Sequence, residues 1–164
     1  MTAQHPLRPV GDEFLADAPL VIRVAADLPN APAEVWEVLG SERMWSWLPV
    51  IDRVRWLSPR PLRAGAVRRL RLARSVILDE EFYRWDDRRR ATFYVQSASR
   101  PLLRALAEDF VLEPTAAGGT RLTWTMALEP NLPRVRRLRL LAPLLRPGNA
   151  LALRGIRREL PPAP

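Results

Sequence analysis

Few side chains in this sequence can carry out chemistry, and two glutamates, Glu80 and Glu108, are the best placed among them. The chain has no cysteine and no lysine, and its one histidine is His5. Disulfides, thiolate metal sites and Schiff-base nucleophiles are therefore excluded, and neither a histidine-based metal site nor a Ser-His-Asp triad is expected. Carboxylates, hydroxyls, phenols, indoles and guanidinium groups remain. A glutamate desolvated among apolar residues has a raised pKa, which suits proton transfer.

Alternation at period two assigns both glutamates to apolar strand faces. Two carboxylates are unusual on a face that serves only as core, so the mixture is typical of a small-molecule site. The face is predicted to consist of Val76, Leu78, Glu80 and Phe82 in one strand, Leu106, Glu108, Phe110 and Leu112 in another, and Leu122, Trp124, Met126 and Leu128 in the last.

Two other interpretations of Glu80 stay open. A shift of register by one residue turns Glu80 to solvent and brings Glu81 inward. An inward Glu80 can also serve as one half of an internal ion pair, with Arg69 or Arg71 as its partner.

The elements that must position these residues follow in a simple order. Residues 19–28 are predicted to form a strand, residues 29–40 a helix between Asn30 and Gly40, and residues 41–49 a second short helix. Six strands follow up to residue 130, joined by short turns, which indicates an antiparallel sheet. Residues 131–160 carry leucines at helical spacing, interrupted by Pro143 and Pro147, and form the remaining cover for the apolar face. The residues expected to pack on the sheet are Leu138, Leu141, Leu145, Leu153 and Ile156.

Composition favours one globular domain. Nearly half of the 164 residues are apolar and 27% are charged, as is typical of a soluble domain. Residues 1–18 are expected to form a flexible tail and residues 19–164 the domain. No apolar run approaches the length of a membrane span, and the N-terminus lacks the apolar segment of a signal peptide, so a cytoplasmic location is expected.

The net charge of +8 has two interpretations. It can signal an anionic partner such as nucleic acid or a membrane surface. Because every basic residue except the histidine is arginine, it can equally reflect the codon bias of a GC-rich genome. No basic strip with interleaved exposed aromatic residues is evident, so nucleic acid is not expected as a partner.

Four stretches together resemble one known superfamily. They are "NAPAEVWEVLG", "WLPVIDRVRWL", "DEEFYRWDDRRRATFYV" and "VLEPTAAGGTRLTWTMALEP". Their order and spacing are similar to the START-like, birch-pollen-allergen-like superfamily, in particular its polyketide cyclase/dehydrase-like (SRPBCC) branch, over residues 20–160. The resemblance implies an α+β helix-grip fold: a curved seven-stranded antiparallel sheet around a C-terminal helix, with two short helices closing one end and a cavity between sheet and helix.

The resemblance also implies site residues. It turns Thr92, Tyr94 and Gln96 inward, and it places Glu80 where similar proteins have a pocket glutamate, whereas Glu108 matches no family carboxylate. The expected ligand-binding residues are Glu80, Phe82, Tyr94, Gln96, Glu108, Phe110, Leu112, Leu122, Trp124 and Met126.

Three functions are compatible with this pattern. The first is binding of a small hydrophobic molecule, lipid- or polyketide-like, in an internal cavity. The second is a cyclase or dehydratase in which Glu80 and Tyr94 perform acid–base chemistry, without metal or cofactor. The third, which is less favoured, is association with an anionic membrane through the leucines and arginines of residues 134–146.

Overall fold

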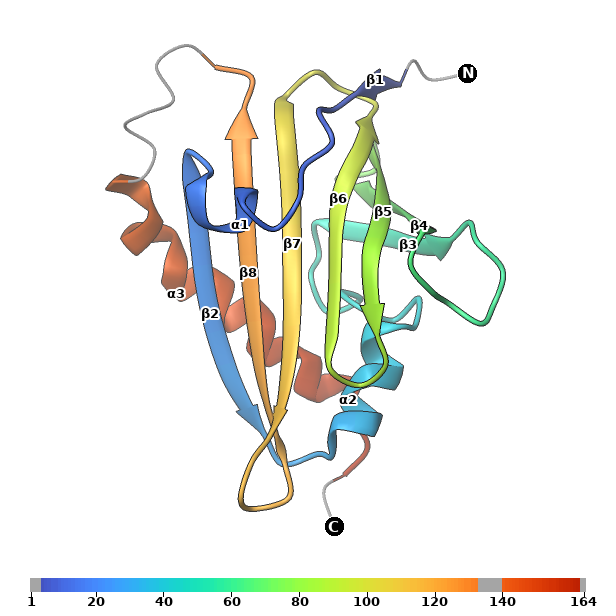
Figure 1. Cartoon of the computed structure of the whole chain (residues 1–164), viewed down its shortest axis with the longest axis vertical. Helices are drawn as coiled ribbons and strands as arrows, with labels where there is room; N and C mark the ends of the chain where they lie inside the picture. Colours follow the sequence, from blue (N-terminus) through green and yellow to red (C-terminus); the bar gives the residue numbers. More distant parts are fainter. Residues whose placement is uncertain (1–3, 133–139, 163–164) are drawn as a thin grey trace.

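The computed structural model describes residues 4–132 and 140–162, and its strands form one curved antiparallel sheet (Figure 1). Within these residues the main path of the sheet has the order β2-β8-β7-β6-β5-β4-β3, with a short β1 paired to β6. The strands are β1 (His5–Pro6), β2 (Leu20–Leu28), β3 (Ile51–Trp56), β4 (Ala66–Leu72), β5 (Val76–Asp86), β6 (Arg90–Ala98), β7 (Leu103–Pro114) and β8 (Thr120–Pro130).

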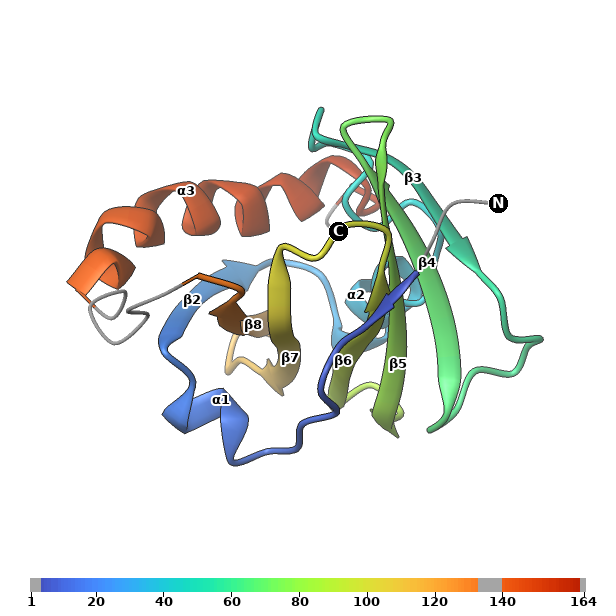
Figure 2. The same ribbon diagram turned by 90° about the horizontal axis from the view of Figure 1, so that it is seen from above.

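The helix-grip architecture predicted from the sequence is confirmed. Strands β3 to β8 follow one another as antiparallel neighbours. Strand β2 pairs with β8 and forms one edge of the sheet, with Ile22 opposite Met126. The C-terminal helix α3 (Ala142–Arg154) lies across the concave side of the sheet, and α2 (Pro32–Leu39) lies near one end (Figure 2). No helix in the described ranges combines the length and apolarity needed to cross a membrane.

The main core fills the concave side, as the alternating pattern of the strands predicts. Phe82, Phe110, Leu112 and Leu122 are all buried there. The first predicted helix, α2, contributes Trp36. Aromatic side chains from several strands also belong to this core, and each buries a large apolar area.

The N-terminal segment differs from the expected flexible tail. Strand β1 pairs with β6, and the amide of Arg8 donates to the carbonyl of Arg104 on β7 at 2.9 Å. Helix α1 (Phe14–Asp17) buries Phe14 in a second, smaller core on the convex face. The strands beneath α1 present alanines there, namely Ala105, Ala107 and Ala127. These small side chains leave room for the helix, and no local pattern in the N-terminal sequence signals such docking.

The second predicted short helix is replaced by turns. Residues 41–47 form a series of turns, and Trp45 has a φ of 71°. This left-handed conformation cannot continue a right-handed helix. It directs the Trp45 ring into the core, where its centroid lies 4.8 Å from that of Trp124.

The C-terminal helix agrees with the prediction only at its end. Leu153 and Ile156 are buried as expected, but Leu141 and Leu145 are 43% and 42% exposed, so their predicted packing is wrong. The first turns of α3 extend beyond the edge strand β2 (Figure 2). Leu138 lies outside the described residues. A short 3₁₀ helix, η2 (Gly155–Arg158), completes the segment.

Candidate functional site

Glu80 points into the concave core, as predicted, and forms an ion pair with Arg68. The two residues lie opposite each other on β5 and β4. The Arg68 Nε donates to Glu80 Oε2 at 2.7 Å, and the side chains are only 1% and 4% exposed. Burial raises the pKa of the Glu80 carboxyl, while the positive charge of Arg68 opposes that rise. The interpretation of Glu80 as an ion-pair member is thus confirmed, although with a different arginine.

The two arginines named in the sequence interpretation lie on the convex face. Arg69 is bonded to Asp79, and Arg71 to Asp52. Alternation along β4 separates them from Arg68, which shares its face with the apolar Ala66 and Leu70. The signal for Arg68 was therefore present in the sequence, in the same alternation that identified Glu80.

Arg68 is surrounded by aromatic rings. Its Cζ lies 5.0 Å from the ring centroid of Phe82, 5.4 Å from that of Phe93 and 5.5 Å from that of Trp56. Such contacts stabilise a desolvated guanidinium through the negative faces of the rings. They do not satisfy its hydrogen-bond donors. The buried Nη2 of Arg68 and the buried Nε1 of Trp56 have no acceptor among the described residues, and these two residues lie opposite each other on β4 and β3.

Glu108 lies on the same concave face, two strands away from Glu80. It is opposite Phe93 on β6, and Phe93 is opposite Phe82 on β5. The indole Nε1 of Trp124 donates to Glu108 Oε2 at 3.0 Å. Burial, together with the negative charge of Glu80, raises the pKa of Glu108 to about 8, against smaller opposing effects of Trp124 and Arg68. At neutral pH Glu108 is therefore mostly protonated and can donate a hydrogen bond.

The two glutamates thus have different partners within one cluster. Glu80 has a cationic partner at hydrogen-bond distance, whereas Glu108 has a neutral indole donor. We call Arg68, Glu80, Glu108, Trp56 and Trp124 the buried polar cluster. Two carboxyl groups in different environments are an arrangement that acid–base chemistry can use.

The predicted apolar lining divides into two parts. Phe82, Phe110, Leu112 and Leu122 are closely packed core residues, and the Phe110 ring stacks on Trp124 at an interplanar angle of 3°. At the end of the concave face formed by the beginnings of β5 and β7 and by the end of β8, the apolar side chains are only partly buried. These are Leu78, Leu103, Leu106, Met126 and Leu128.

An apolar pocket of about 280 Å³ opens at this partly buried end. Its lining includes Val76 and Leu78, which precede Glu80 on the same face of β5. Because same-face neighbours on a strand are about 7 Å apart, the pocket begins close to the buried polar cluster. The complete lining is Leu72, Val76, Leu78, Ala98, Arg100, Leu102 and Leu103.

The inward placement of Thr92 and Tyr94 is wrong. The hydroxyl of Tyr94 donates to Glu81 on the convex face at 3.0 Å, and its ring packs against the core beneath α1. The hydroxyl of Thr92 donates to Asp109 at 2.7 Å. Phe93 occupies the concave face instead. Tyr94 therefore lies across the sheet from Glu80 and cannot act with it on one substrate.

The resemblance had placed its inward aromatic at Tyr94, whereas the neighbouring aromatic residue, Phe93, lies opposite Phe82. Two irregularities also interrupt the pairing of β5 with β6. The register shifts between Asp79 and Glu80, and again between Phe82 and Arg84. At the first shift Asp79 pairs with Ser97 and Glu80 with Val95, so Gln96 has no partner on β5. A β-bulge changes which residues share a face, and simple alternation cannot reveal it. The predicted inward position of Gln96 falls in this irregular stretch.

Comparisons with known proteins agree with this geometry. A family model described as polyketide cyclase / dehydrase and lipid transport matches residues 20–161. The uncharacterised protein Rv2574 of Mycobacterium tuberculosis is 36% identical over 155 residues, covering 94% of this chain and 92% of that protein. An uncharacterised protein of Mycobacterium bovis is similar to the same extent, also with 36% identity over 155 residues.

Solved structures share the fold at low sequence identity. A START superfamily protein from Mycobacterium smegmatis has a TM-score of 0.61 and 16% identity, covering 84% of this chain and 98% of that chain. Ginseng major latex-like protein 151 from Panax ginseng has a TM-score of 0.64 and 14% identity, covering 87% and 97%. The family model covers most of the chain and leads to one conclusion: the chain belongs to the polyketide cyclase / dehydrase and lipid transport family.

Proposed function

We propose that this protein binds a small, largely apolar molecule whose polar end carries hydrogen-bond acceptor oxygens. The family is associated in general with small hydrophobic ligands. The apolar part of the ligand occupies the pocket beside Leu78, and its polar end contacts the buried polar cluster. This placement is supported by the continuity of the concave face from the pocket to Glu80.

The observation that carries the proposal is the buried, unsatisfied Nη2 of Arg68. A buried donor without an acceptor destabilises a protein by about 1–3 kcal/mol, and by more when the group is charged. The Nε1 of Trp56 is in the same state on the neighbouring strand. A ligand oxygen that accepts from both groups removes this penalty on binding.

The charges of the cluster favour a neutral acceptor over an anion. Arg68 already has one carboxylate partner, Glu80, so a ligand carboxylate would meet repulsion from it. Glu108 is mostly protonated at neutral pH and supplies a further donor. A ketone, an ester or a 1,3-dicarbonyl group on an apolar chain fits these donors best.

The test is a comparison of two probes with equal apolar area. A long-chain 1,3-diketone and the corresponding alkane are each measured by displacement of a fluorescent apolar dye. We expect the diketone to bind more tightly by about tenfold or more, the difference of one well-made buried hydrogen bond. Equal affinities for the two probes would contradict the proposed polar contact.

A matched pair of variants locates that contact. Trp56→Phe removes one unsatisfied donor and should weaken diketone binding while leaving alkane binding unchanged. Trp85→Phe is the control, since its ring packs against both Trp56 and Phe82 but its nitrogen is not among the buried unsatisfied atoms. If both variants weaken the two probes equally, the effect is one of packing.

A second candidate function, acid–base catalysis, is favoured by the different partners of the two glutamates, a guanidinium for Glu80 and an indole for Glu108. In the dehydration of a β-hydroxy ketone, Glu80 would take the proton from the carbon beside the carbonyl, and Glu108 would protonate the departing hydroxyl so that it leaves as water. Glu80→Gln should then retain binding and lose turnover by roughly 10²–10⁴-fold. If the unmodified protein binds such a substrate but does not turn it over, catalysis is refuted and ligand binding remains as the proposed function.

The membrane alternative now depends on the exposed leucines of α3. Leu144 and Leu151 are 75% and 72% exposed on the helix, and residues 140–158 carry four arginines and no acidic residue. An apolar stripe with basic neighbours is typical of helices that lie on anionic membranes. The arginines at positions 134, 136, 137 and 139, which first suggested this function, lie outside the described residues.

A further inference from the structure

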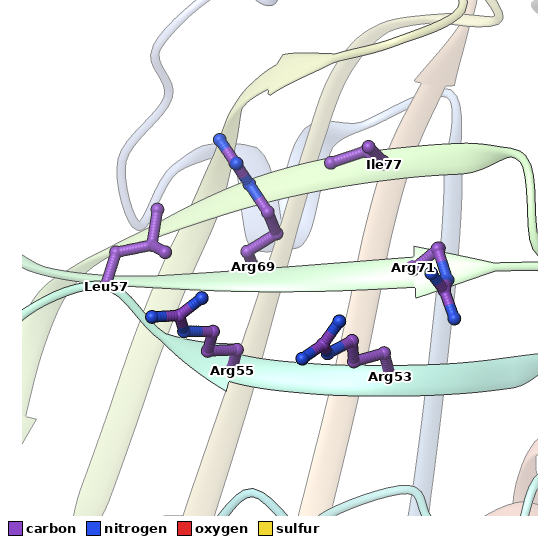
Figure 3. Close-up of a pocket in the computed structure, with 6 residues that line it drawn as sticks. All are labelled: Arg53, Arg55, Leu57, Arg69, Arg71 and Ile77. Atoms are coloured by element: carbon purple, nitrogen blue, oxygen red, sulfur yellow. The ribbon is translucent and has the colours of Figure 1, made fainter. Parts of the chain in front are cut away.

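A second recess lies on the convex face of the sheet, across β3, β4 and the start of β5 (Figure 3). It has a volume of about 200 Å³. Because the buried polar cluster occupies the concave face, one small ligand cannot contact both sites. We call this recess the arginine groove, and its lining is Arg53, Arg55, Leu57, Arg69, Arg71 and Ile77.

The arginines of the groove face one another across two strands. Arg53 lies opposite Arg71, and Arg55 lies opposite Arg69. Like charges placed directly opposite each other destabilise a sheet. Such an arrangement needs anionic groups to neutralise it.

Only two of the four arginines in the groove are paired with carboxylates of the described residues. Arg69 donates two hydrogen bonds to Asp79, at 2.6 and 2.7 Å, and Arg71 is paired with Asp52. Arg53 and Arg55 are exposed, and their guanidinium groups have no hydrogen-bond or ion-pair partner in the part of the chain that the structure describes. Two free guanidinium groups therefore project from alternate positions of the edge strand β3.

We propose that the arginine groove binds a phosphate-bearing anion, with Arg53 and Arg55 as its principal ligands. Guanidinium groups match phosphate oxygens with paired N–H donors, and they do so better than a point charge does. Side chains two residues apart on a strand start about 7 Å apart, so both can converge on an anion with several acceptor oxygens, such as a diphosphate. Leu57 and Ile77 add apolar contacts at the border of the groove for the rest of the molecule.

The phosphate can come from a soluble molecule or from a lipid headgroup. Inorganic pyrophosphate, measured by calorimetry, represents the first source. Vesicles of phosphatidylcholine with and without phosphatidic acid represent the second. Binding to pyrophosphate identifies a soluble phosphate ligand, whereas binding only to vesicles that contain phosphatidic acid identifies a lipid headgroup. Binding to neither probe overturns the proposal.

Two double variants with the same net charge distinguish binding at the arginine groove from general electrostatic attraction to the protein. Arg53→Gln with Arg55→Gln should weaken binding of the positive probe by about tenfold or more, as expected for the loss of at least one charge-assisted hydrogen bond. The control is Arg63→Gln with Arg89→Gln, two exposed arginines that do not line the groove. Equal weakening by both double variants overturns the proposal, because the anion would then respond only to net charge.

A direct measurement on the unmodified protein does not depend on how the variants fold. The side-chain N–H signals of Arg53 and Arg55 should shift on addition of pyrophosphate, while those of Arg63 and Arg89 should not. Charged residues also protect edge strands against pairing with other chains. If the groove variant binds the probe normally but aggregates, Arg53 and Arg55 serve that protective role and the proposal fails.

Discussion

Replacement of Glu80 by glutamine tests the buried ion pair directly. The variant leaves a carbonyl oxygen that can still accept from Arg68, but it removes the negative charge beside a guanidinium that is 1% exposed. Breaking a buried ion pair typically destabilises a protein by about 3–5 kcal/mol. Because one hydrogen bond of about 1 kcal/mol is retained, we expect Glu80→Gln to lower the free energy of unfolding by about 2–4 kcal/mol.

The assay is urea unfolding, with Asp79→Asn as the matched control. Asp79 is the neighbour of Glu80 and is also paired with an arginine, Arg69, but that arginine is 42% exposed. Because solvent reaches Arg69, this pair is more strongly screened than the Arg68–Glu80 pair and should contribute less. Glu80→Gln should therefore shift the unfolding midpoint clearly more than Asp79→Asn does. Equal shifts would refute the assignment of Arg68 and Glu80 as a desolvated pair.

A double replacement completes the test. Arg68→Met combined with Glu80→Leu removes both charges and leaves apolar side chains of similar size. Such replacements of a buried pair are often neutral or stabilising, although the ring contacts of Arg68, worth about 0.5–2 kcal/mol, are lost. The double variant should therefore be at least as stable as Glu80→Gln alone. If it is much less stable, the stabilisation lies in the contacts of Arg68 with the rings and not in the ion pair.

Three further predictions follow from other parts of the fold. Glu108 has a folded-state pKa of about 8, above its ordinary value of 4.5, so the folded state binds more protons than the unfolded state between these two pH values. The free energy of unfolding should therefore fall as pH rises through this window, by up to roughly 1.4 kcal/mol per pH unit. Urea unfolding of Glu108→Gln across the same pH range should show a weaker decline. Phe14→Ala should lower the free energy of unfolding by about 3 kcal/mol, because Phe14 is the buried side chain through which α1 packs on the sheet. An unchanged urea midpoint would mean that this segment behaves as the tail expected from the sequence. Gly155→Ala should destabilise by about 1–3 kcal/mol, because a β-carbon at this position would collide with the Trp47 ring; a thermal melt that matches the unmodified protein would place that ring elsewhere.

The exposed leucines of α3 permit a test of the membrane alternative. Leu144→Ser with Leu151→Ser should reduce flotation with anionic vesicles without changing the unfolding midpoint, since both side chains lie mostly in solvent. Each removes apolar area that would enter the interface, and the loss should persist at high salt. Flotation that depends only on salt, and not on the leucines, would indicate simple charge attraction.

The sequence alone was sufficient for the strand order and for one face of most strands. In β5, β7 and β8 apolar residues alternate over a full strand, and a half-buried sheet requires that alternation because neighbouring side chains point to opposite faces. The same rule identified Glu80 and Glu108 as inward. It could also have identified Arg68, which occupies an inward position of β4 between Ala66 and Leu70.

Tertiary structure decided the rest, because the interactions concerned are not local. The resemblance turned Thr92 and Tyr94 inward, but the register of β6 against β5 places Phe93 on the concave face, and a register with bulges depends on the partner strand as much as on the strand itself. The docking of α1 depends on alanines about a hundred residues away in the chain. The first turns of α3 extend beyond the edge strand β2, and no local pattern shows where that strand lies relative to the helix. Local patterns specify which side chains could share a face, but only the packing of distant segments determines which of those faces are covered.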